Sequence, residues 1–185
     1  QDLSGLDLSQ VDTIDLDGHT GVVLDAELMG KTIVDVATGG SYTVKDSAGD
    51  IQYAISQGST QLDNLDGATS ITVDPAGRVE MNIETFKKLG DEIDAGSIKI
   101  VDDAQNISTY VKDGNSLPAA ADVVAQAKPS SPDLTGLDLT GVDTIDLNGL
   151  AVTMNVDQAK LTRIDSDTNS AGTFKVVDDA DDIES

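Results

Sequence analysis

A long internal repeat is the feature that most constrains the fold of this chain. Residues 2–18 have the sequence DLSGLDLSQVDTIDLDG, and residues 133–149 have the sequence DLTGLDLTGVDTIDLNG. The two segments are identical at 13 of 17 positions, at a constant offset of 131 residues. Self-similarity at a fixed spacing is typical of repeat architectures. We therefore predict that the chain is built from copies of one unit.

Two shorter blocks indicate how many copies there are. The first block recurs as VVLDAEL at 22–28, VEMNIET at 79–85 and VTMNVDQ at 152–158. The second follows it each time, as SYTVKDSAGDI at 41–51, SIKIVDDAQNI at 97–107 and TFKVVDDADDI at 173–183. This constant order predicts three units, at residues 1–58, 59–113 and 133–185, of which the last is truncated.

Residues 114–132 interrupt the pattern of repeats. They contain three of the four prolines, together with runs of alanine and pairs of serine. Such a composition is typical of a connecting segment. We predict a Pro/Ala/Ser linker here, with one short helix over Ala119–Ala127.

Within each unit the apolar pattern changes from strand-like to helix-like. Alternation in 13–16 and 22–24, around the turn signal Asp17-Gly18, predicts two short strands. Asp25 then begins a short helix, and in the second copy residues 83–89 have apolar spacing that suits one helical face. A further strand leads in each copy to an aspartate that we expect to cap a second helix, namely Asp46, Asp102 and Asp178.

Units of this size with 3% aromatic residues bury little core alone, so we expect them to share one apolar layer. Leucines spaced as L-x-x-L-x-L in 3–8 and 134–139 favour short strands stacked in parallel. The predicted fold is an α/β, solenoid-like repeat array of short strands and short helices with about three units. Mainly β bead-like modules are the alternative. The column Tyr42, Ile98 and Phe174 and the methionines Met29, Met81 and Met154 are predicted to lie in the core.

Composition excludes several classes of function. The formal net charge is −23, from 34 acidic residues of which 29 are aspartate, against 11 basic residues. So negative a surface repels phosphate backbones and anionic lipids, and no apolar stretch approaches the ~20 residues of a membrane span. Cysteine is absent and His19 is the sole histidine, which excludes disulfides, cysteine-based metal sites and zinc sites with two histidines.

Calcium is the one ligand that the acidic clusters suggest. The motif Asp15-Leu16-Asp17-Gly18 fails as an EF-hand, because Leu24 would occupy the twelfth position, where an acid is needed. An Asx-stabilised turn is the simpler interpretation, with an irregular calcium site as the alternative. Helix capping or cation binding are the two interpretations of the paired acids. The candidate calcium ligands are Asp15, Asp17, Asp102, Asp103, Asp178 and Asp179.

No pair of acids is singled out as a catalytic pair, and the chain contains no tryptophan for a sugar-binding platform. We therefore expect no enzymatic activity.

The phrase V-x-D-x-A-x-[DN]-I, seen at 44–51 and 176–183 and, with isoleucine in first place, at 100–107, resembles a repeated phrase of very long bacterial surface proteins. The L-D-L-[ST]-x-V-D-T-I-D-L stretches are similar to theirs as well. The resemblance is to acidic, cysteine-free modules of type I-secreted proteins of the RTX-type adhesin and S-layer-like kinds. The glycine-rich calcium nonapeptide of RTX rolls is absent from this chain, so their calcium ligands are not implied here.

This resemblance implies a structural or adhesive repeat segment, acting as a spacer, a lattice element or a filament element at the bacterial cell surface. Copy three stops where copy one begins a helix, so we expect a segment of a longer protein. The partners implied are neighbouring repeats, other copies of the chain, a cell-surface glycan or another surface protein. A dedicated divalent-cation or mineral-binding protein is the alternative, and a carbohydrate-binding module is the third possibility.

Overall fold

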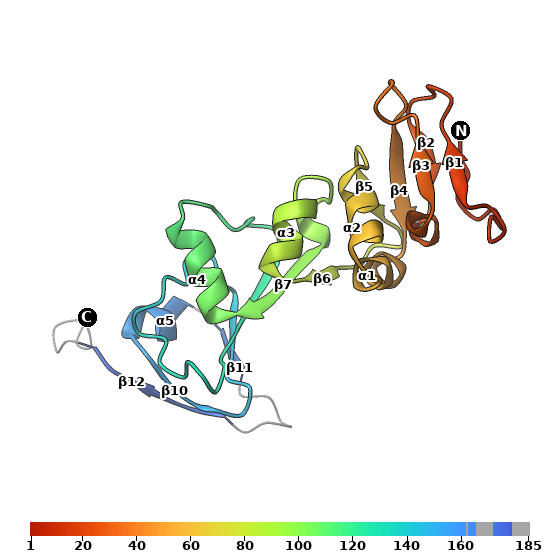
Figure 1. Ribbon diagram of the computed structural model, residues 1–185. Coiled ribbons are helices and arrows are strands. Elements are labelled where there is room, and N and C mark those ends of the chain that lie inside the picture. Colours follow the sequence, from red (N-terminus) through yellow and green to blue (C-terminus); the bar gives the residue numbers. More distant parts are fainter. Residues whose placement is uncertain (162, 166–171, 179–185) are drawn as a thin grey trace. The chain divides into compact units, whose positions relative to one another are not determined.

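A computed structural model describes residues 1–161, 163–165 and 172–178 of the chain (Figure 1). The protein is a mixed α/β protein, with several small parallel sheets and five α-helices in this described part. It divides into two compact units, one formed by residues 1–80 and 84–98 and the other by residues 81–83 and 99–185. These units are defined by contacts, and they do not coincide with the three copies that sequence similarity predicts.

The first unit contains two parallel sheets. In one sheet β1 (Thr13–Asp15) pairs with β3 (Thr32–Val34), and in the other β2 (Val22–Leu24), β4 (Tyr42–Asp46) and β5 (Ile71–Val73) lie in that order. The helices are η1 (Ala26–Gly30), α1 (Ala48–Ser56), α2 (Ser59–Asp66), most of α3 (Ile83–Leu89) and η2 (Ala95–Ser97). Helices α1 and α2 pack against η1 and against each other (Figure 1).

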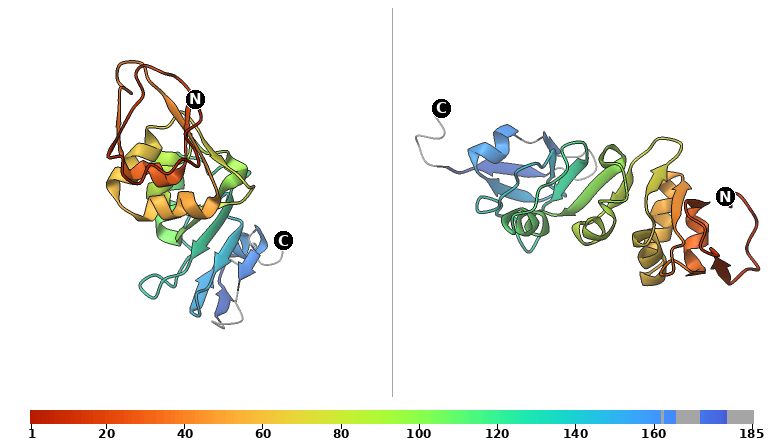
Figure 2. Two further views of the ribbon diagram at one scale, coloured as in Figure 1. Left: turned by 90° about the vertical axis from the view of Figure 1, so that its right-hand side faces the viewer. Right: turned by 90° about the horizontal axis from the view of Figure 1, so that it is seen from above.

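The second unit has the same character. Its larger sheet contains β11 (Arg163–Asp165), β9 (Thr144–Asp146), β8 (Asp122–Gln126) and β7 (Ile98–Asp103), in that order. The division between the units falls within the short strand β6 (Val79–Met81). Its smaller sheet pairs β10 (Ala151–Met154) with β12 (Thr173–Val176). Strands of this unit run side by side in one direction (Figure 2). Its helices are α4 (Ala104–Lys112) and α5 (Val156–Leu161).

Parallel pairing repeats at a nearly constant distance along the chain. Paired residues are 19 apart in β1/β3 and β9/β11, 20 apart in β2/β4 and β8/β9, 22 apart in β10/β12 and 23 apart in β7/β8. The pair β4/β5, at 27 residues, has the longest connection, because α1 and α2 both lie within it. A parallel pair requires a crossover connection, and here about 20 residues supply it.

The core follows the alternation of these short strands. Val22 and Leu24 of β2 are buried, as are Val152 and Met154 of β10, while the residue between each pair is partly exposed. The three methionines predicted to lie in the core are buried. Tyr42 and Ile98 are buried as predicted, but Phe174 is 48% exposed, so its placement in the core is wrong.

The expected elements are confirmed in large part, with four differences. The two strands around Asp17-Gly18 form, but each pairs with a different strand further along the chain. The helix expected over Ala119–Ala127 is wrong, because β8 occupies this segment between β7 and β9. Neither β3 nor α2 was expected. The helix predicted after Asp178 falls on residues 179–185, outside the described residues.

Candidate functional site

Aspartates at the ends of strands form the most regular cluster of polar contacts in this protein. Each places one carboxylate oxygen on a backbone N–H that lies 19 to 22 residues earlier. The five contacts are Asp25 with Gly5 N (3.0 Å), Asp46 with Ala26 N (3.0 Å), Asp102 with Ile83 N (2.9 Å), Asp143 with Val123 N (2.9 Å) and Asp178 with Val156 N (3.0 Å). Charged acceptors make stronger hydrogen bonds than neutral ones, so these five contacts firmly join segments that lie about 20 residues apart in the chain.

The parallel register explains this geometry. Parallel pairing places each of these aspartates beside a segment about 20 residues earlier, and in three of the five cases a helix begins at that point. The first amides of a helix have no partner within it, and the neighbouring carboxylate supplies one. The sequence predicted that Asp46 and Asp102 cap the helices that follow them, and this prediction is wrong. Ser47 and Asp103 are the N-caps of α1 and α4.

The candidate calcium ligands at helix starts are engaged in these contacts. Asp102 accepts from Ile83 N and Asp103 N through different oxygens, and also from the side chain of Asn106. Asp103 accepts from Gln105 N at 3.0 Å, and Asp178 accepts from Val156 N. Asp179 lies outside the described residues. Hydrogen bonding to the backbone is thus what the structure shows for Asp102, Asp103 and Asp178.

The other two candidates form a tight turn. Asp15 accepts from Asp17 N at 3.0 Å, and Asp17 and Gly18 both have positive φ, at 47° and 69°. The equivalent Asp146 accepts from Asn148 N at 2.8 Å, and Asn148 has φ 49°. This confirms the predicted Asx turn. Within the residues described, no group of three or more acidic or histidine side chains is placed to hold a metal ion.

A second short motif, Asp-x-Ser/Thr, occurs twice in each copy of the long repeat. Asp2 accepts from the hydroxyl of Ser4 at 2.6 Å and from its N–H, and Asp133 accepts from Thr135 in the same way. These hydrogen bonds favour the charged form, so they lower the pKa of both carboxyls. Asp7 and Asp138 have lowered pKa values for the same reason. These four carboxylates are therefore ionised acceptors and are poorly suited to act as general acids.

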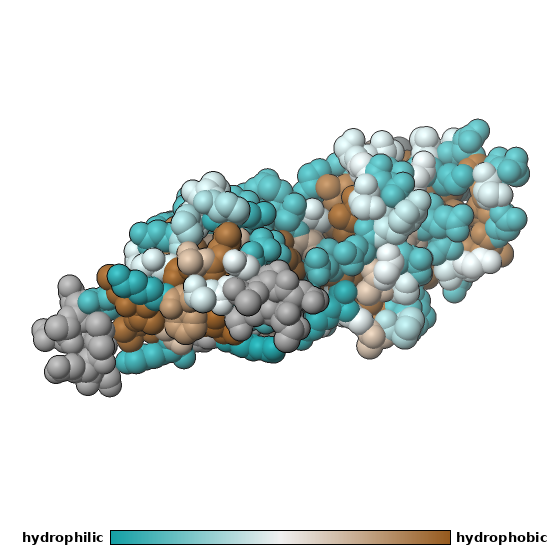
Figure 3. All heavy atoms as spheres, turned by 90° about the horizontal axis from the view of Figure 1, so that it is seen from below, coloured by the Kyte–Doolittle hydropathy of each residue, from teal (hydrophilic) through white to brown (hydrophobic). Residues whose placement is uncertain are grey.

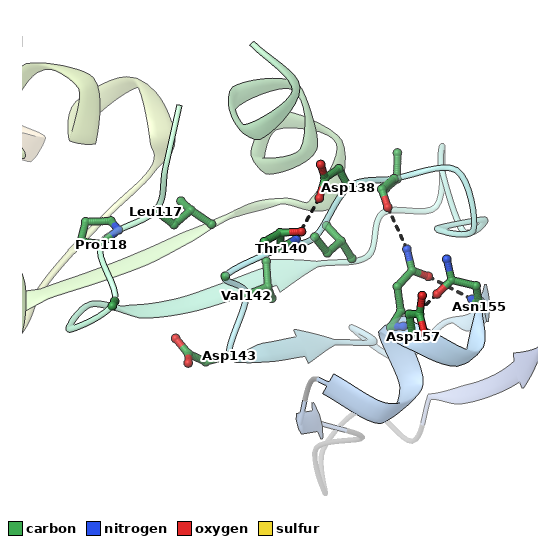
Figure 4. Close-up of a pocket in the computed structure, with 13 residues that line it drawn as sticks. Leu117, Pro118, Asp138, Thr140, Val142, Asp143, Asn155 and Asp157 are labelled. Carbon is green, nitrogen blue, oxygen red and sulfur yellow. Dashed lines mark hydrogen bonds between the residues drawn. The ribbon is translucent and has the colours of Figure 1, made fainter. Parts of the chain in front are cut away.

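The second unit contains a cavity of about 690 Å³ (Figure 4). Leu117 and Pro118, which follow α4, form one side of it, and Asn155 and Asp157 at the start of α5 form the other. Its polar groups largely hold its own walls together. Gln158, for example, donates to the carbonyl oxygens of Leu134 and Leu137 at 2.7 and 3.0 Å. The cavity thus lies where the segment after α4 meets the 133–149 repeat.

A second hollow, of about 630 Å³, lies along η1, α1 and α2 in the first unit. It is lined by acidic residues that include Glu27 and Asp50, and by Tyr53, whose side chain is largely exposed. Asp50 accepts from Ser47 within the N-terminal turn of α1, and Asp46 is engaged as described above. Neither hollow brings together a nucleophile, a base and an orienting group.

Glu92 is a polar residue that the sequence did not single out. Its Oε2 is buried without a hydrogen-bond partner, while its backbone carbonyl accepts from Ile71 N at 2.7 Å. Burial raises the pKa of its carboxyl, and the nearby charges of Asp66 and Asp91 add to the rise. No short motif surrounds Glu92 in the sequence, so only tertiary packing identifies it.

The 20-residue spacing was also missed, although the sequence carries a signal for it. The strands that pair at this spacing begin with similar tripeptides, TID at 13–15 and 144–146, TIV at 32–34 and RID at 163–165. The longer copies at 1–58, 59–113 and 133–185 conceal this shorter period, because insertions such as α1 and α2 break its spacing.

No helix among the described residues has both the length and the apolar character needed to cross a membrane. Comparisons of the chain with protein-family models, with curated proteins and with solved structures find no match.

Proposed function

We propose that this chain is a non-catalytic structural or adhesive repeat segment of an extracellular bacterial surface protein. Its role would be that of a spacer, a lattice element or a filament element. The observation that carries the proposal is the parallel register at about 20 residues, together with strand-end carboxylates that bind backbone amides of the preceding turn. Both the parallel strand pairing and the carboxylate–amide contacts use backbone groups. An array held by such contacts can therefore be extended by further turns without a specialised binding site.

The same observation supports a finer statement on the fold. We propose that successive turns stack as a solenoid-like array, in which each turn contacts only its neighbours. Such an array lengthens by addition of turns, which suits a spacer or a filament. The high negative charge keeps the chain soluble, and the absence of cysteine removes any risk of mispairing in an oxidising exterior.

Divalent-cation binding is the second candidate function. The exposed aspartates of the Asp15-Asp17 turn support it, because crowded carboxylates repel each other and a bound cation relieves that repulsion. Binding at defined sites would give saturable, stoichiometric heats of calcium binding in calorimetry. Weak heats that do not saturate and that disappear in NaCl would contradict a dedicated cation-binding function.

Carbohydrate binding is the weaker third candidate, since both hollows lack tryptophan. A glycan array probed with the purified chain tests it, and an array without hits would contradict it.

The main proposal is tested on intact cells of the source bacterium. Antibodies raised against the chain should label unpermeabilised cells, and brief protease treatment of those cells should remove the label. A cytoplasmic protein serves as the control that must stay unlabelled and intact. Label that appears only after lysis would contradict the proposed location and function.

A further inference from the structure

The cavity of about 690 Å³ in the second unit coincides with a difference between the two copies of the long repeat (Figure 4). The segments 2–18 and 133–149 differ at four positions. Two of these differences exchange serine for threonine, and one exchanges aspartate for asparagine. The fourth replaces Gln10 by Gly141, and Gly141 lines the cavity. The largest change of side chain between the copies therefore falls at this cavity.

Gly141 leaves its part of the cavity wall without a side chain. Its φ is 83°, in the left-handed region that favours glycine. A Cβ at this position would lie 3.4 Å from Leu117 Cβ, at the limit of ordinary van der Waals contact. A longer side chain, such as the glutamine of the first copy, would pack against Leu117 and occupy part of the cavity. Glycine thus keeps this space open.

A second residue of the lining also differs between copies. Gln158 stands where the first copy has Leu28, in the block that follows the long repeat. Both are buried, Leu28 at 3% and Gln158 at 6% exposed. A buried amide costs free energy unless it is hydrogen-bonded, and Gln158 donates to the carbonyl oxygens of Leu134 and Leu137. This polar side chain fixes the wall of the cavity in a place where the first copy has a core leucine.

The lining combines apolar side chains with carboxylates. Its larger apolar residues are Leu117, Pro118, Leu137, Leu139 and Val142. Its acidic residues are Asp138, Asp143 and Asp157. Leu139 and Val142 are buried, whereas Asp143 and Asp157 are exposed, so the apolar surface lies deeper than these two carboxylates. None of the residues that line the cavity, all of them described and all within 117–158, is basic.

The negative charge at the cavity is not compensated. Among the described residues, the carboxylate of Asp157 accepts no hydrogen bond, and Asp143 uses Oδ2 alone, on Val123 N at 2.9 Å. The whole chain has a formal net charge of −23, and hydrophilic residues cover much of the face that Figure 3 shows. A hollow lined by charge of one sign raises the local concentration of ions of the opposite sign. Cations should therefore gather at this cavity.

We propose that this cavity binds a small amine with an apolar body, which lies against Leu117 and Leu139 while its ammonium group lies near Asp157. The volume of the cavity is within the range of about 300–1,000 Å³ that is usual for small-molecule sites. A bare calcium ion fits less well, because it requires about six to eight oxygen ligands and much of this lining is apolar. The inference goes beyond the proposed function, since a spacer or a filament element needs no small ligand.

The first test is an NMR titration of the full ¹⁵N-labelled chain with three probes of the same shape and different charge. Phenylbutylamine is cationic, phenylbutanol is neutral and phenylbutyrate is anionic. We expect saturable shifts from the amine, centred on residues 117–119, 137–143 and 155–158. The alcohol should bind at least about 3-fold more weakly, as loss of one ion pair implies, and the anion more weakly still. Equal affinity for amine and alcohol would overturn the role of the carboxylates.

The variant Gly141→Asn tests the space in the cavity. Asparagine tolerates a positive φ better than other side chains, and its amide would occupy the volume beside Leu117. Affinity for phenylbutylamine should fall by more than about 10-fold, as loss of the apolar contact implies. The amide spectrum of the variant checks that it is folded. A folded Gly141→Asn chain that binds the amine as wild type does would overturn the proposal.

The variant Asp157→Asn tests the charge without filling the cavity. Affinity should fall by about 2- to 5-fold, the range expected for an exposed ion pair. Glu27→Gln is the matched control, because Glu27 is the equivalent exposed residue of the first copy and lines the other hollow. It should leave affinity unchanged. A loss in Glu27→Gln as large as in Asp157→Asn would place the amine in the other hollow and would overturn the proposal.

Salt and a peptide probe complete the experiment. Raising NaCl from about 0.01 to about 0.15 M should weaken binding of the amine without abolishing it, because screening acts on the charge and not on the apolar contact. Binding that disappears in salt, or wild-type chain without shifts at millimolar amine, would overturn the proposal. A lysine-rich peptide that binds more tightly than the amine would overturn it too, since it would indicate a protein partner. Surface labelling of cells is independent of these results.

Discussion

Aspartate has two roles in this chain that its abundance alone does not distinguish. Some carboxylates bind backbone N–H groups about 20 residues earlier, as Asp46 and Asp102 do, and others close local turns, as Asp15 and Asp133 do. Both roles use the charge of the carboxylate to satisfy backbone N–H groups. A large part of the net charge therefore consists of structural acceptors.

The carboxylate of Asp102 should matter for stability. Replacement by alanine leaves Ile83 N and Asp103 N without their acceptor, and an unsatisfied amide costs about 1–3 kcal/mol. We expect Asp102→Ala to lower the free energy of unfolding by about that amount, measured by urea denaturation followed by circular dichroism. Asp113→Ala, at an exposed aspartate after α4, is the control and should change it by less than about 0.5 kcal/mol. Equal losses in the two variants would contradict the role of Asp102.

Glu92 should make stability depend on pH. The pKa of its carboxyl is raised in the folded state, so the folded state binds the proton more tightly than the unfolded state. Its stabilising contribution is present below the unfolded pKa of about 4.3 and is lost as pH rises through the folded pKa. We expect Glu92→Gln to melt at a higher temperature than wild type at pH 7, with a difference that shrinks toward pH 4.

The exposed Glu27 provides the control for this experiment. Glu27→Gln should not reproduce the pH-dependent difference in melting temperature. If Glu92→Gln melts below wild type at pH 7, the buried oxygen of Glu92 has a stabilising partner and the prediction is wrong.

At the scale of elements, the short strands and helices were well predicted wherever a local signal exists. Alternation identified β1 and β2, the recurring block that leads to Asp46 identified β4, and apolar spacing identified α3. The segment that contains β8 was predicted as a helix, because the alanines and valines of 119–127 have no decisive local period. Its place in the sheet comes from β7 and β9 on either side. Tertiary pairing overrides weak local preference in such segments.

Helix α2 depends on contacts that no local pattern reveals. Asn64 donates to the carbonyl oxygens of Met29 and Lys31 at 2.7 and 2.9 Å, which satisfies the end of η1, and the Tyr42 hydroxyl donates to the Asn64 carbonyl. Burial of that hydroxyl raises the pKa of Tyr42 to about 12. We therefore expect Asn64→Ala to lower the free energy of unfolding by about 1–3 kcal/mol.

Urea denaturation provides the measurement for Asn64→Ala as well. Thr60→Ala, at an exposed position of the same helix, is the matched control and should be neutral or slightly stabilising, because alanine favours helix. If Thr60→Ala lowers the free energy of unfolding as much as Asn64→Ala does, the effect comes from α2 as a whole. That result would contradict the role of the Asn64 side chain.

At the scale of the whole molecule, the net charge of −23 opposes compaction. Raising NaCl from about 0.01 to about 0.15 M screens this repulsion, so the melting temperature should rise. Differential scanning calorimetry at low protein concentration measures the shift apart from any self-association. A melting temperature independent of salt would contradict the prediction.

The same calorimeter can distinguish specific binding of calcium from general screening of charge by salt. CaCl₂, MgCl₂ and NaCl are compared at equal ionic strength, and a chelator is then added. A rise specific to calcium, reversed by the chelator and lost in an Asp15→Asn/Asp17→Asn double variant, would support a calcium site at that turn. Identical curves in the three salts would contradict one.

The sequence by itself determined that the chain is repetitive, mixed in secondary structure and free of cysteine and histidine clusters. It also located most of the short strands, because period-two alternation and turn residues are local signals. Tertiary structure alone decided which strands pair, that pairing recurs at about 20 residues, and that Asp46 and Asp102 bind backbone amides about 20 residues earlier rather than capping their own helices. It also decided that Leu134 and Leu139 are buried while the equivalent Leu3 and Leu8 are partly exposed. The physical reason is that burial and hydrogen bonding depend on segments that are distant in the sequence, and a residue's own sequence context does not specify which segments those are.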